Sequence, residues 1–185
     1  NPTEETDQTI LQNSISQTIE EAKRATEISR NGVAAWETRG VVYREIRGLV
    51  EGANKWAIDA FEKAIALEPT NPALHTELGK LYIAEASISG DDTKQKREVD
   101  AKQEFEKAIK LKSNYIDARI QLALFSEYQK NLKEATDQLL DLKSYFPNEA
   151  EVVFQLGRLY FNEGQIDKAI VEFEIANIRT QSVNA

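Results

Sequence analysis

The sequence predicts an all-α protein that is built from repeated pairs of helices. Similar segments recur along the chain, among them AIDAFEKA at residues 57–64, AKQEFEKA at residues 101–108 and AIVEFEIA at residues 169–176. Around these segments, apolar residues recur at steps of three and four, which is the pattern of an amphipathic helix. A segment that recurs at a regular spacing indicates a repeated structural unit.

The composition limits the classes of function that the chain can have. Of its 185 residues, 41% are hydrophobic and 29% are charged, and the net charge is −8. This length suits one compact domain or a short repeat array. An acidic chain releases few counterions from phosphates, so we expect no nucleic-acid partner. The sequence has no apolar run of about 18 residues, so we expect no direct membrane insertion.

The chain also lacks both cysteine and methionine. Without cysteine it has no disulfide, no thiolate nucleophile and no cysteine ligand for a metal. Without an initiator methionine, we interpret the sequence as a fragment of a larger protein. The compartment stays open between the cytoplasm and an extracytoplasmic location.

Two sets of positions measure the repeat. In the first set a glycine lies three residues before a tyrosine, at Gly40 with Tyr43, Gly79 with Tyr82 and Gly157 with Tyr160, and Ala123 replaces the glycine in the third unit. In the second set an alanine lies four residues before a phenylalanine or leucine, at Ala57 with Phe61, Ala101 with Phe105, Ala135 with Leu139 and Ala169 with Phe173. Successive alanines of the second set are 44, 34 and 34 residues apart. The basic unit is therefore 34 residues long.

A 34-residue unit with Leu-Gly, then Tyr, then Ala, Phe and Ala resembles the tetratricopeptide repeat. The last unit shows the pattern best, at Leu156, Gly157, Tyr160, Ala169, Phe173 and Ala176. The resemblance covers about residues 33–180. It implies a bacterial-style, right-handed α-solenoid of four helical hairpins, because one hairpin cannot bury its own apolar face and must stack on the next.

The expected elements follow in chain order. Residues 1–7 are expected to be a disordered tail, and residues 8–30 an N-terminal capping helix with a narrow apolar stripe. The four hairpins are expected at residues 31–70, 71–114, 115–148 and 149–180, followed by a tail at residues 181–185. The first two hairpins carry insertions near residues 47–52 and 87–98, where their two helices join. These insertions are either tolerated surface turns or one shared edge that contacts a partner.

The sequence contains no constellation of catalytic residues. His75 is the only histidine, and it occupies a position where the repeat pattern places a packing residue. A single histidine without cysteine does not make a transition-metal site of the usual kind. Acid–base catalysis needs two positioned groups, and we find no such pair. We therefore expect no enzyme activity, no metal and no cofactor.

The resemblance implies a scaffold that binds a protein or peptide ligand in the concave groove lined by the first helix of each hairpin. By the repeat pattern, the groove residues are Glu37, Val41, Arg44, Thr76, Lys80, Ile83, Ile120, Leu124, Glu127, Phe154, Arg158 and Phe161. Members of the family that clamp the carboxylate ends of chaperones use lysine and asparagine at set groove positions. This chain lacks those residues there, which disfavours a ligand of that kind. What remains is an apolar strip beside basic residues, suited to an apolar helix face or an extended peptide.

Two alternatives stay open. The array is a structural spacer or an oligomerisation module, in which the apolar C-terminal helix associates end to end with another copy through Ile170, Phe173 and Ile178. The acidic repeats also resemble the soluble tails of bacterial membrane proteins such as surface-polysaccharide polymerases and ligases.

Overall fold

The protein is described by a computed structural model that covers the backbone of residues 2–183 and the side chains of residues 7–177. Within this part of the chain all regular structure is helical, which confirms the all-α prediction. The chain divides into two compact units, at residues 1–111 and 112–185. The helices of the first unit are α1 (Pro2–Ile28), α2 (Val33–Glu45), α3 (Ala53–Leu67), α4 (Pro72–Ala86) and α5 (Asp91–Leu111). Those of the second unit are α6 (Ile116–Tyr128), α7 (Leu132–Tyr145), α8 (Ala150–Asn162) and α9 (Ile166–Val183).

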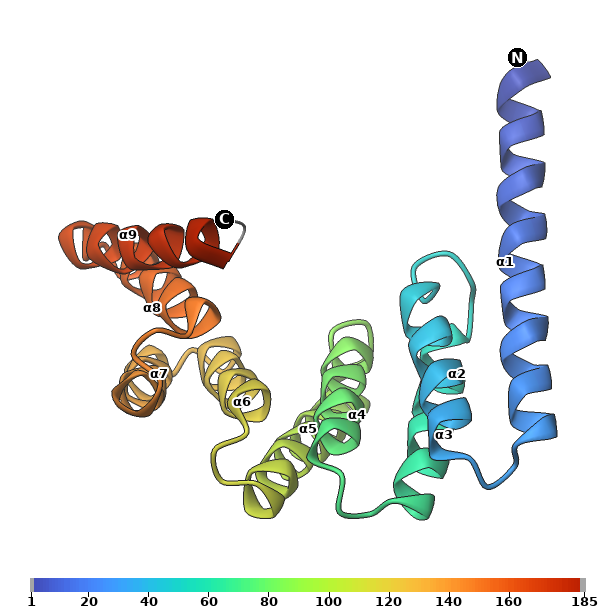
Figure 1. Ribbon diagram of the computed structural model, residues 1–185, viewed down its shortest axis with the longest axis horizontal. Helices are drawn as coiled ribbons and strands as arrows, with labels where there is room; N and C mark the ends of the chain where they lie inside the picture. Colours follow the sequence, from blue (N-terminus) through green and yellow to red (C-terminus); the bar gives the residue numbers. More distant parts are fainter. Residues whose placement is uncertain (1, 184–185) are drawn as a thin grey trace. The chain divides into compact units, whose positions relative to one another are not determined.

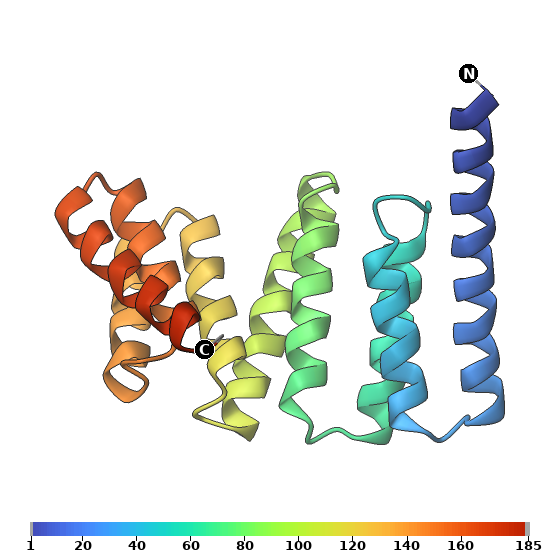
Figure 2. The same ribbon diagram turned by 45° about the horizontal axis from the view of Figure 1, so that its top comes forward.

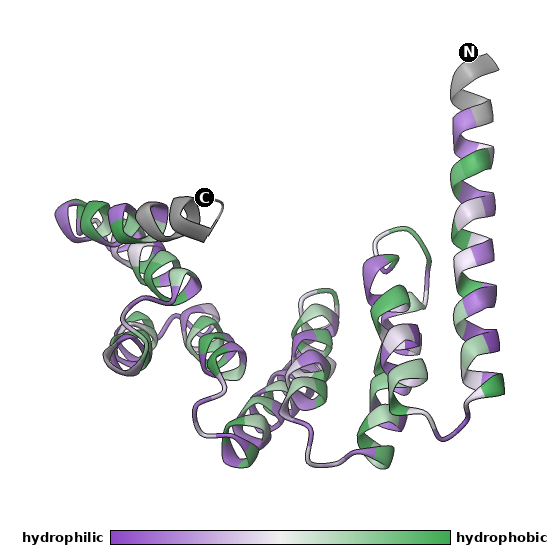
Figure 3. Ribbon diagram, in the orientation of Figure 1, coloured by the Kyte–Doolittle hydropathy of each residue, from purple (hydrophilic) through white to green (hydrophobic). Residues whose placement is uncertain are grey.

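Consecutive helices pair into hairpins, α2 with α3 and α4 with α5 in the first unit, and α6 with α7 and α8 with α9 in the second (Figure 1). We call α2, α4, α6 and α8 the first helices, and α3, α5, α7 and α9 the second helices. Apolar and polar residues are interleaved along the helices, as expected when each helix buries one face (Figure 3). Within each unit, each hairpin packs on the next element along the chain.

The helices begin where the sequence provides a cap. Asn71 precedes Pro72, and its side chain accepts a hydrogen bond of 3.0 Å from the backbone N–H of Ala73. Proline suits the first helical position because its missing N–H would have no partner there. Asn131 caps α7 in the same way, by accepting from the backbone N–H of Glu134. Such caps satisfy amide groups that the helix itself leaves unpaired.

The turn inside the third and fourth hairpins uses the same backbone conformation at positions 34 residues apart. Lys130 has φ 64° and Gly164 has φ 75°, both in the left-handed region. The residue after each of them donates a backbone hydrogen bond back into the first helix, from Asn131 to Ser126 at 2.9 Å and from Gln165 to Tyr160 at 2.8 Å. This is the usual way to end a helix, and glycine adopts it with less strain than lysine.

The small residue of each first helix packs directly on the large residue of its second helix. A Cβ atom added to Gly79 would lie 2.5 Å from the ring of Phe105, and one added to Gly40 would lie 2.6 Å from the ring of Phe61. In the third hairpin Ala123 faces the smaller Leu139 instead, and both are fully buried. The repeat pattern therefore fixes how closely the two helices of a hairpin approach.

The second unit has a continuous core between its two hairpins. Leu139 and Leu142 of α7 are fully buried in one cluster with Val152, Leu156 and Leu159 of α8. Phe146 packs against the same cluster. The apolar stripe of α8 thus covers the second helix of the preceding hairpin, as stacking of repeats requires.

The expected boundaries differ from the observed ones at both ends. Helix α1 begins at Pro2, where the sequence analysis expects a tail up to residue 7. Helix α9 continues to Val183, into the tail expected at residues 181–185, of which residues 184 and 185 lie outside the described residues.

Helix α1 packs on α2 through its C-terminal half. Ala22 and Thr26 are buried, whereas Ile10 and Leu11 of the same helix are more than half exposed. Figures 1 and 2 show the N-terminal half of α1 extending past the end of the neighbouring hairpin. The predicted apolar stripe is therefore covered only over its second half.

Candidate functional site

One ion pair links the first helices of the first unit, and a second ion pair within α4 adjoins it. The Arg44 guanidinium on α2 forms a salt bridge with Glu77 on α4. Lys80, one turn further along α4, donates to the same carboxylate at 2.9 Å. The two predicted basic groove residues of this unit therefore share one acidic partner, Glu77, which is not among the predicted groove residues. Val41 on α2 and Ile83 on α4 remain partly exposed near this cluster.

A second ion pair links the first helices of the second unit. Both terminal nitrogens of Arg158 on α8 donate to the carboxylate of Glu127 on α6, at 2.8 and 2.5 Å. Asn162 donates to the same carboxylate at 3.2 Å. The hydrogen bond from Arg158 holds the pKa of Glu127 below its ordinary value of 4.5. Two of the predicted groove residues thus contact each other across neighbouring hairpins.

This pair predicts a pH dependence of stability. Because the pKa of Glu127 is lower in the folded state, its contribution is complete above about pH 4.5 and is lost as the pH falls through the folded pKa. Glu127→Gln is expected to lower the free energy of unfolding at pH 7 and to have less effect at pH 3. Urea unfolding at both pH values measures this, with Glu174→Gln on the exposed face of α9 as the control. An equal effect of Glu127→Gln at the two pH values would contradict the linkage.

The structure places the twelve predicted groove residues in three groups. Thr76 and Ile120 are buried and pack inside their units, so their expected contact with a ligand stays a prediction. The Thr76 hydroxyl donates to the carbonyl of Pro72, and Ile120 belongs to the core cluster of the second unit. Arg44, Lys80, Glu127 and Arg158 are the ion-paired residues described above.

The third group is exposed or partly exposed and mostly apolar. It consists of Glu37, Val41, Ile83, Leu124, Phe154 and Phe161. Phe161 is 60% exposed and lies on the same helix as Arg158. Phe154 points to a different neighbour, because its ring lies 5.8 Å from that of Phe173 on α9. The face of the second unit that contains the ion pair therefore presents Leu124 and Phe161.

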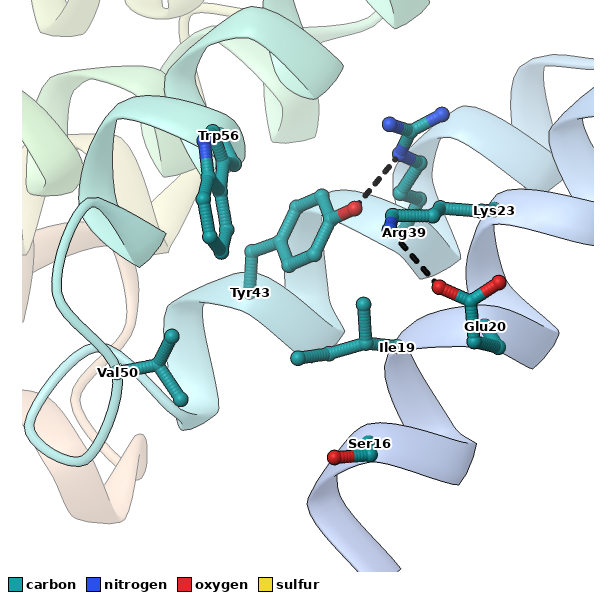
Figure 4. Close-up of a pocket in the computed structure, with 8 residues that line it drawn as sticks. All are labelled: Ser16, Ile19, Glu20, Lys23, Arg39, Tyr43, Val50 and Trp56. Atoms are coloured by element: carbon teal, nitrogen blue, oxygen red, sulfur yellow. Dashed lines mark hydrogen bonds and ion pairs between the residues drawn. The ribbon is translucent and has the colours of Figure 1, made fainter. Parts of the chain in front are cut away.

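A cavity of about 480 Å³ lies between α1 and the first hairpin (Figure 4). Its apolar walls come from Ile19 of α1, Tyr43 of α2, Val50 of the turn between α2 and α3, and Trp56 of α3. The rings of Tyr43 and Trp56 lie 5.5 Å apart, and the Arg39 guanidinium donates to the Tyr43 hydroxyl at 3.2 Å. The first insertion therefore forms one wall of a cavity instead of an isolated surface turn.

The sequence did not predict this cavity, although it did indicate the insertion near residues 47–52. The signals were Trp56, a large aromatic residue just after the inserted turn, and the apolar pair of Leu49 and Val50 between two glycines. The wall supplied by α1 could not be placed from the sequence, because the register of a lone helix against the array depends on packing.

His75 is buried, and both of its ring nitrogens lie within hydrogen-bonding distance of other residues of the chain. Its Nδ1 lies 2.6 Å from a carboxylate oxygen of Glu104 on α5, and its Nε2 lies 3.0 Å from the backbone carbonyl oxygen of Pro69. Lys107 donates to the other oxygen of Glu104 at 2.6 Å. Among the described residues, no group of three or more histidine or acidic side chains is arranged to hold a metal ion.

The sites described above are exposed faces and one cavity, and the elements that form them are helical hairpins. This architecture defines a repeat protein of the helical-hairpin class. Residues 150–176 match the sequence model of the tetratricopeptide repeat. This match covers most of the fourth hairpin, and the fold of the chain is similar to that of solved tetratricopeptide-repeat structures. No curated protein sequence matches the chain.

Solved structures resemble the fold over nearly the whole chain. The thermophilic tetratricopeptide-repeat protein TTC0263 of Thermus thermophilus is similar with a TM-score of 0.75 and 16% identity, covering 97% of this chain and 90% of that one. MamA of Desulfovibrio magneticus is similar with a TM-score of 0.65 and 13% identity, covering 99% and 95%. PilF of Pseudomonas aeruginosa is similar with a TM-score of 0.65 and 19% identity, covering 92% and 71%. At these identities the likeness shows the fold alone.

Proposed function

We propose that this protein is a non-catalytic scaffold that binds a protein or peptide along the exposed faces of its first helices. The repeat fold favours protein–protein interaction in general. The observation that carries the proposal is the arrangement of charged and apolar side chains on these faces. The charged residues Arg44, Glu127 and Arg158 are paired between neighbouring hairpins, while the apolar side chains beside them stay partly or fully exposed.

The exposed side chains indicate the chemistry of the ligand. Ile83 in the first unit, and Leu124 and Phe161 in the second, each present apolar surface next to an ion pair. A ligand that covers them gains from burying apolar area, at about 25 cal/mol per Å². Since the ion pairs are already formed, the faces are ordered before binding, which lowers the entropic cost of association. The ligand is therefore expected to be a peptide or helix with apolar anchors.

A peptide-display selection against the intact chain tests this proposal. We expect a consensus with one or more large apolar residues, and we expect Phe161→Glu, at a side chain that is 60% exposed, to weaken binding of the consensus peptide by about tenfold or more. Leu140→Glu is the matched control, because Leu140 is an exposed leucine on a second helix of the same unit. A selection without enrichment, or equal losses in both variants, would contradict the proposal.

A spacer or oligomerisation module is the second candidate, favoured by the apolar surface of α9. Ile170 and Val171 of this helix are about half exposed and Phe173 is half-buried, whereas the side chain of Ile178 lies outside the described residues. Sedimentation of the chain over a concentration series tests it, with Ile170→Glu as the variant. Association that Ile170→Glu abolishes would support this candidate, and a concentration-independent monomer would contradict it.

Within the described residues, no helix has both the length and the apolar character needed to cross a membrane.

A further inference from the structure

We propose that the cavity between α1 and the first hairpin binds a small amphipathic carboxylate, whose apolar body lies against Trp56 and whose carboxylate pairs with Arg39. We call it the α1 cavity; it is the cavity of about 480 Å³ shown in Figure 4. This volume is typical of small-molecule pockets. All of its walls belong to the first unit, and none of the residues that carry the proposed function lines it. The two proposals are therefore independent.

Arg39 occupies a position at which the other three hairpins have leucine. The residue before the small packing residue is Leu78, Leu122 or Leu156 in those hairpins, and Leu78 and Leu156 are buried. An arginine in this place gives up apolar burial, and partial burial of a charge is unfavourable unless the charge is paired. The packing of a hairpin therefore does not require Arg39.

The hydrogen bonds of Arg39 hold its guanidinium without neutralising it. Its Nε donates to the Tyr43 hydroxyl at 3.2 Å, and its Nη1 donates to the Thr26 hydroxyl at 2.9 Å. Both acceptors are uncharged, and no carboxylate among the described residues forms an ion pair with Arg39. The other charges of the lining, on Lys23 and Glu20, pair with each other at 2.9 Å. The α1 cavity thus has one uncompensated positive charge, which attracts a carboxylate.

Trp56 is a second residue that the repeat pattern does not explain. The residue before the packing alanine is charged in the other three hairpins, where it is Asp100, Glu134 or Lys168. Trp56 is 41% exposed, and its ring lies 5.5 Å from that of Tyr43. An exposed indole beside a cavity offers a large apolar area to a ligand.

The apolar and charged parts of the lining lie on different sides of the cavity. Trp56 and Val50 lie on one side of the Tyr43 ring, and Arg39 lies beyond the hydroxyl on the other side (Figure 4). A matching ligand has an apolar body at one end and a single carboxylate at the other. A peptide segment would bring backbone amides against the apolar walls, where an amide without a partner is unfavourable. A small acid therefore fits better than a peptide.

Isothermal titration calorimetry of the intact chain with 1-naphthaleneacetate tests the proposal. The neutral 1-naphthaleneacetamide has nearly the same shape and serves as the matched ligand. We expect saturable binding of the acid, and we expect the acid to bind about tenfold more tightly than the amide, because only the acid makes a charge-assisted contact with Arg39. Absence of saturable binding, or equal affinities of the two compounds, would overturn the proposal.

Variants at Arg39 test the origin of the preference for the acid. Arg39→Leu installs the residue of the other hairpins, so we expect it to fold and to reduce the preference to less than about twofold. Arg24→Leu removes the same charge from an exposed position of α1 outside the cavity, and it should leave the preference unchanged. Arg39→Lys should retain part of it, which gives a second measurement if Arg39→Leu does not fold. An unchanged preference in Arg39→Leu, or a complete loss in Arg39→Lys, would contradict the assignment.

Variants at Trp56 test the apolar end of the site. Trp56→Ala is expected to weaken binding of both compounds by about tenfold. Leu67→Ala is the control on the same helix, because Leu67 is 39% exposed and does not line the cavity. Equal losses in these two variants would overturn the proposed position of the ligand. A blocked peptide with adjacent tryptophan and aspartate that bound tenfold more tightly than the acid would overturn the small acid in favour of a protein segment.

Discussion

Replacing Gly79 with alanine is expected to lower the free energy of unfolding of the first unit by about 2 kcal/mol. The added Cβ would lie 2.5 Å from the ring of Phe105, far inside van der Waals contact. The ring is 1% exposed, so it has no free space into which to move. The two helices of the second hairpin must separate, or the ring must leave its preferred rotamer. Urea unfolding followed by circular dichroism measures the loss.

Gly90→Ala is the control for the loss of a glycine as such. A Cβ at Gly90 meets nothing within 4 Å, so this substitution should change the stability by less than about 0.5 kcal/mol. Backbone entropy alone favours alanine over glycine, so it cannot explain a loss. Similar losses for the two variants would contradict the contact with the ring as the cause at Gly79.

The third hairpin suggests how the loss at Gly79 can be relieved. It has Ala123 in the place of the glycine and Leu139 in the place of the phenylalanine, and both are fully buried. We therefore expect Phe105→Leu to reduce the cost of Gly79→Ala, so that the double variant is more stable than the sum of the single losses predicts. A strictly additive double-mutant cycle would contradict a direct contact between the two positions.

The second large effect is expected at the buried histidine. His75→Ala removes the contacts of the imidazole with Glu104 and with the Pro69 carbonyl, and it leaves a cavity. The Glu104 carboxylate, which is 8% exposed, would then keep Lys107 as its described partner. Losing one member of a buried polar pair and creating a cavity together cost about 2–4 kcal/mol.

A milder variant separates the hydrogen bond from the charge. Glu104→Gln keeps an amide that offers Nδ1 either an acceptor oxygen or a donor N–H, so it should cost less than half as much as His75→Ala. Thermal unfolding of the two variants makes the comparison. If Glu104→Gln were as damaging as His75→Ala, the charge of the carboxylate, and not its hydrogen bond, would be the main contribution.

The hairpins were predictable because their signal is local and repeated. The glycine and the aromatic residue that meet inside a hairpin, such as Gly79 and Phe105, recur in step in three of the four units, so the spacing alone indicates the contact. The start of α5 was equally predictable, because Gly90 followed by two aspartates marks the beginning of a helix.

The surfaces were less predictable because they depend on what the next hairpin covers. The repeat pattern treats Ile120 and Phe154 as equivalent, yet one is buried and the other exposed, since only Ile120 has a following hairpin in its unit. The partner of His75 was also missed, because Glu104 lies 29 residues away on another helix. Finding such a pair requires the rotation of both helices, which the sequence fixes only approximately.

The ion pairs between the third and fourth hairpins affect how the second unit can bend. Glu127 and Arg158 join the two first helices, and Lys143 donates to Glu172 at 2.7 and 2.6 Å to join the two second helices. Bending the two hairpins toward their first helices lengthens the ion pair between Lys143 and Glu172. Bending them in the opposite direction lengthens the ion pair between Glu127 and Arg158. Together the two ion pairs oppose bending of the second unit in either direction.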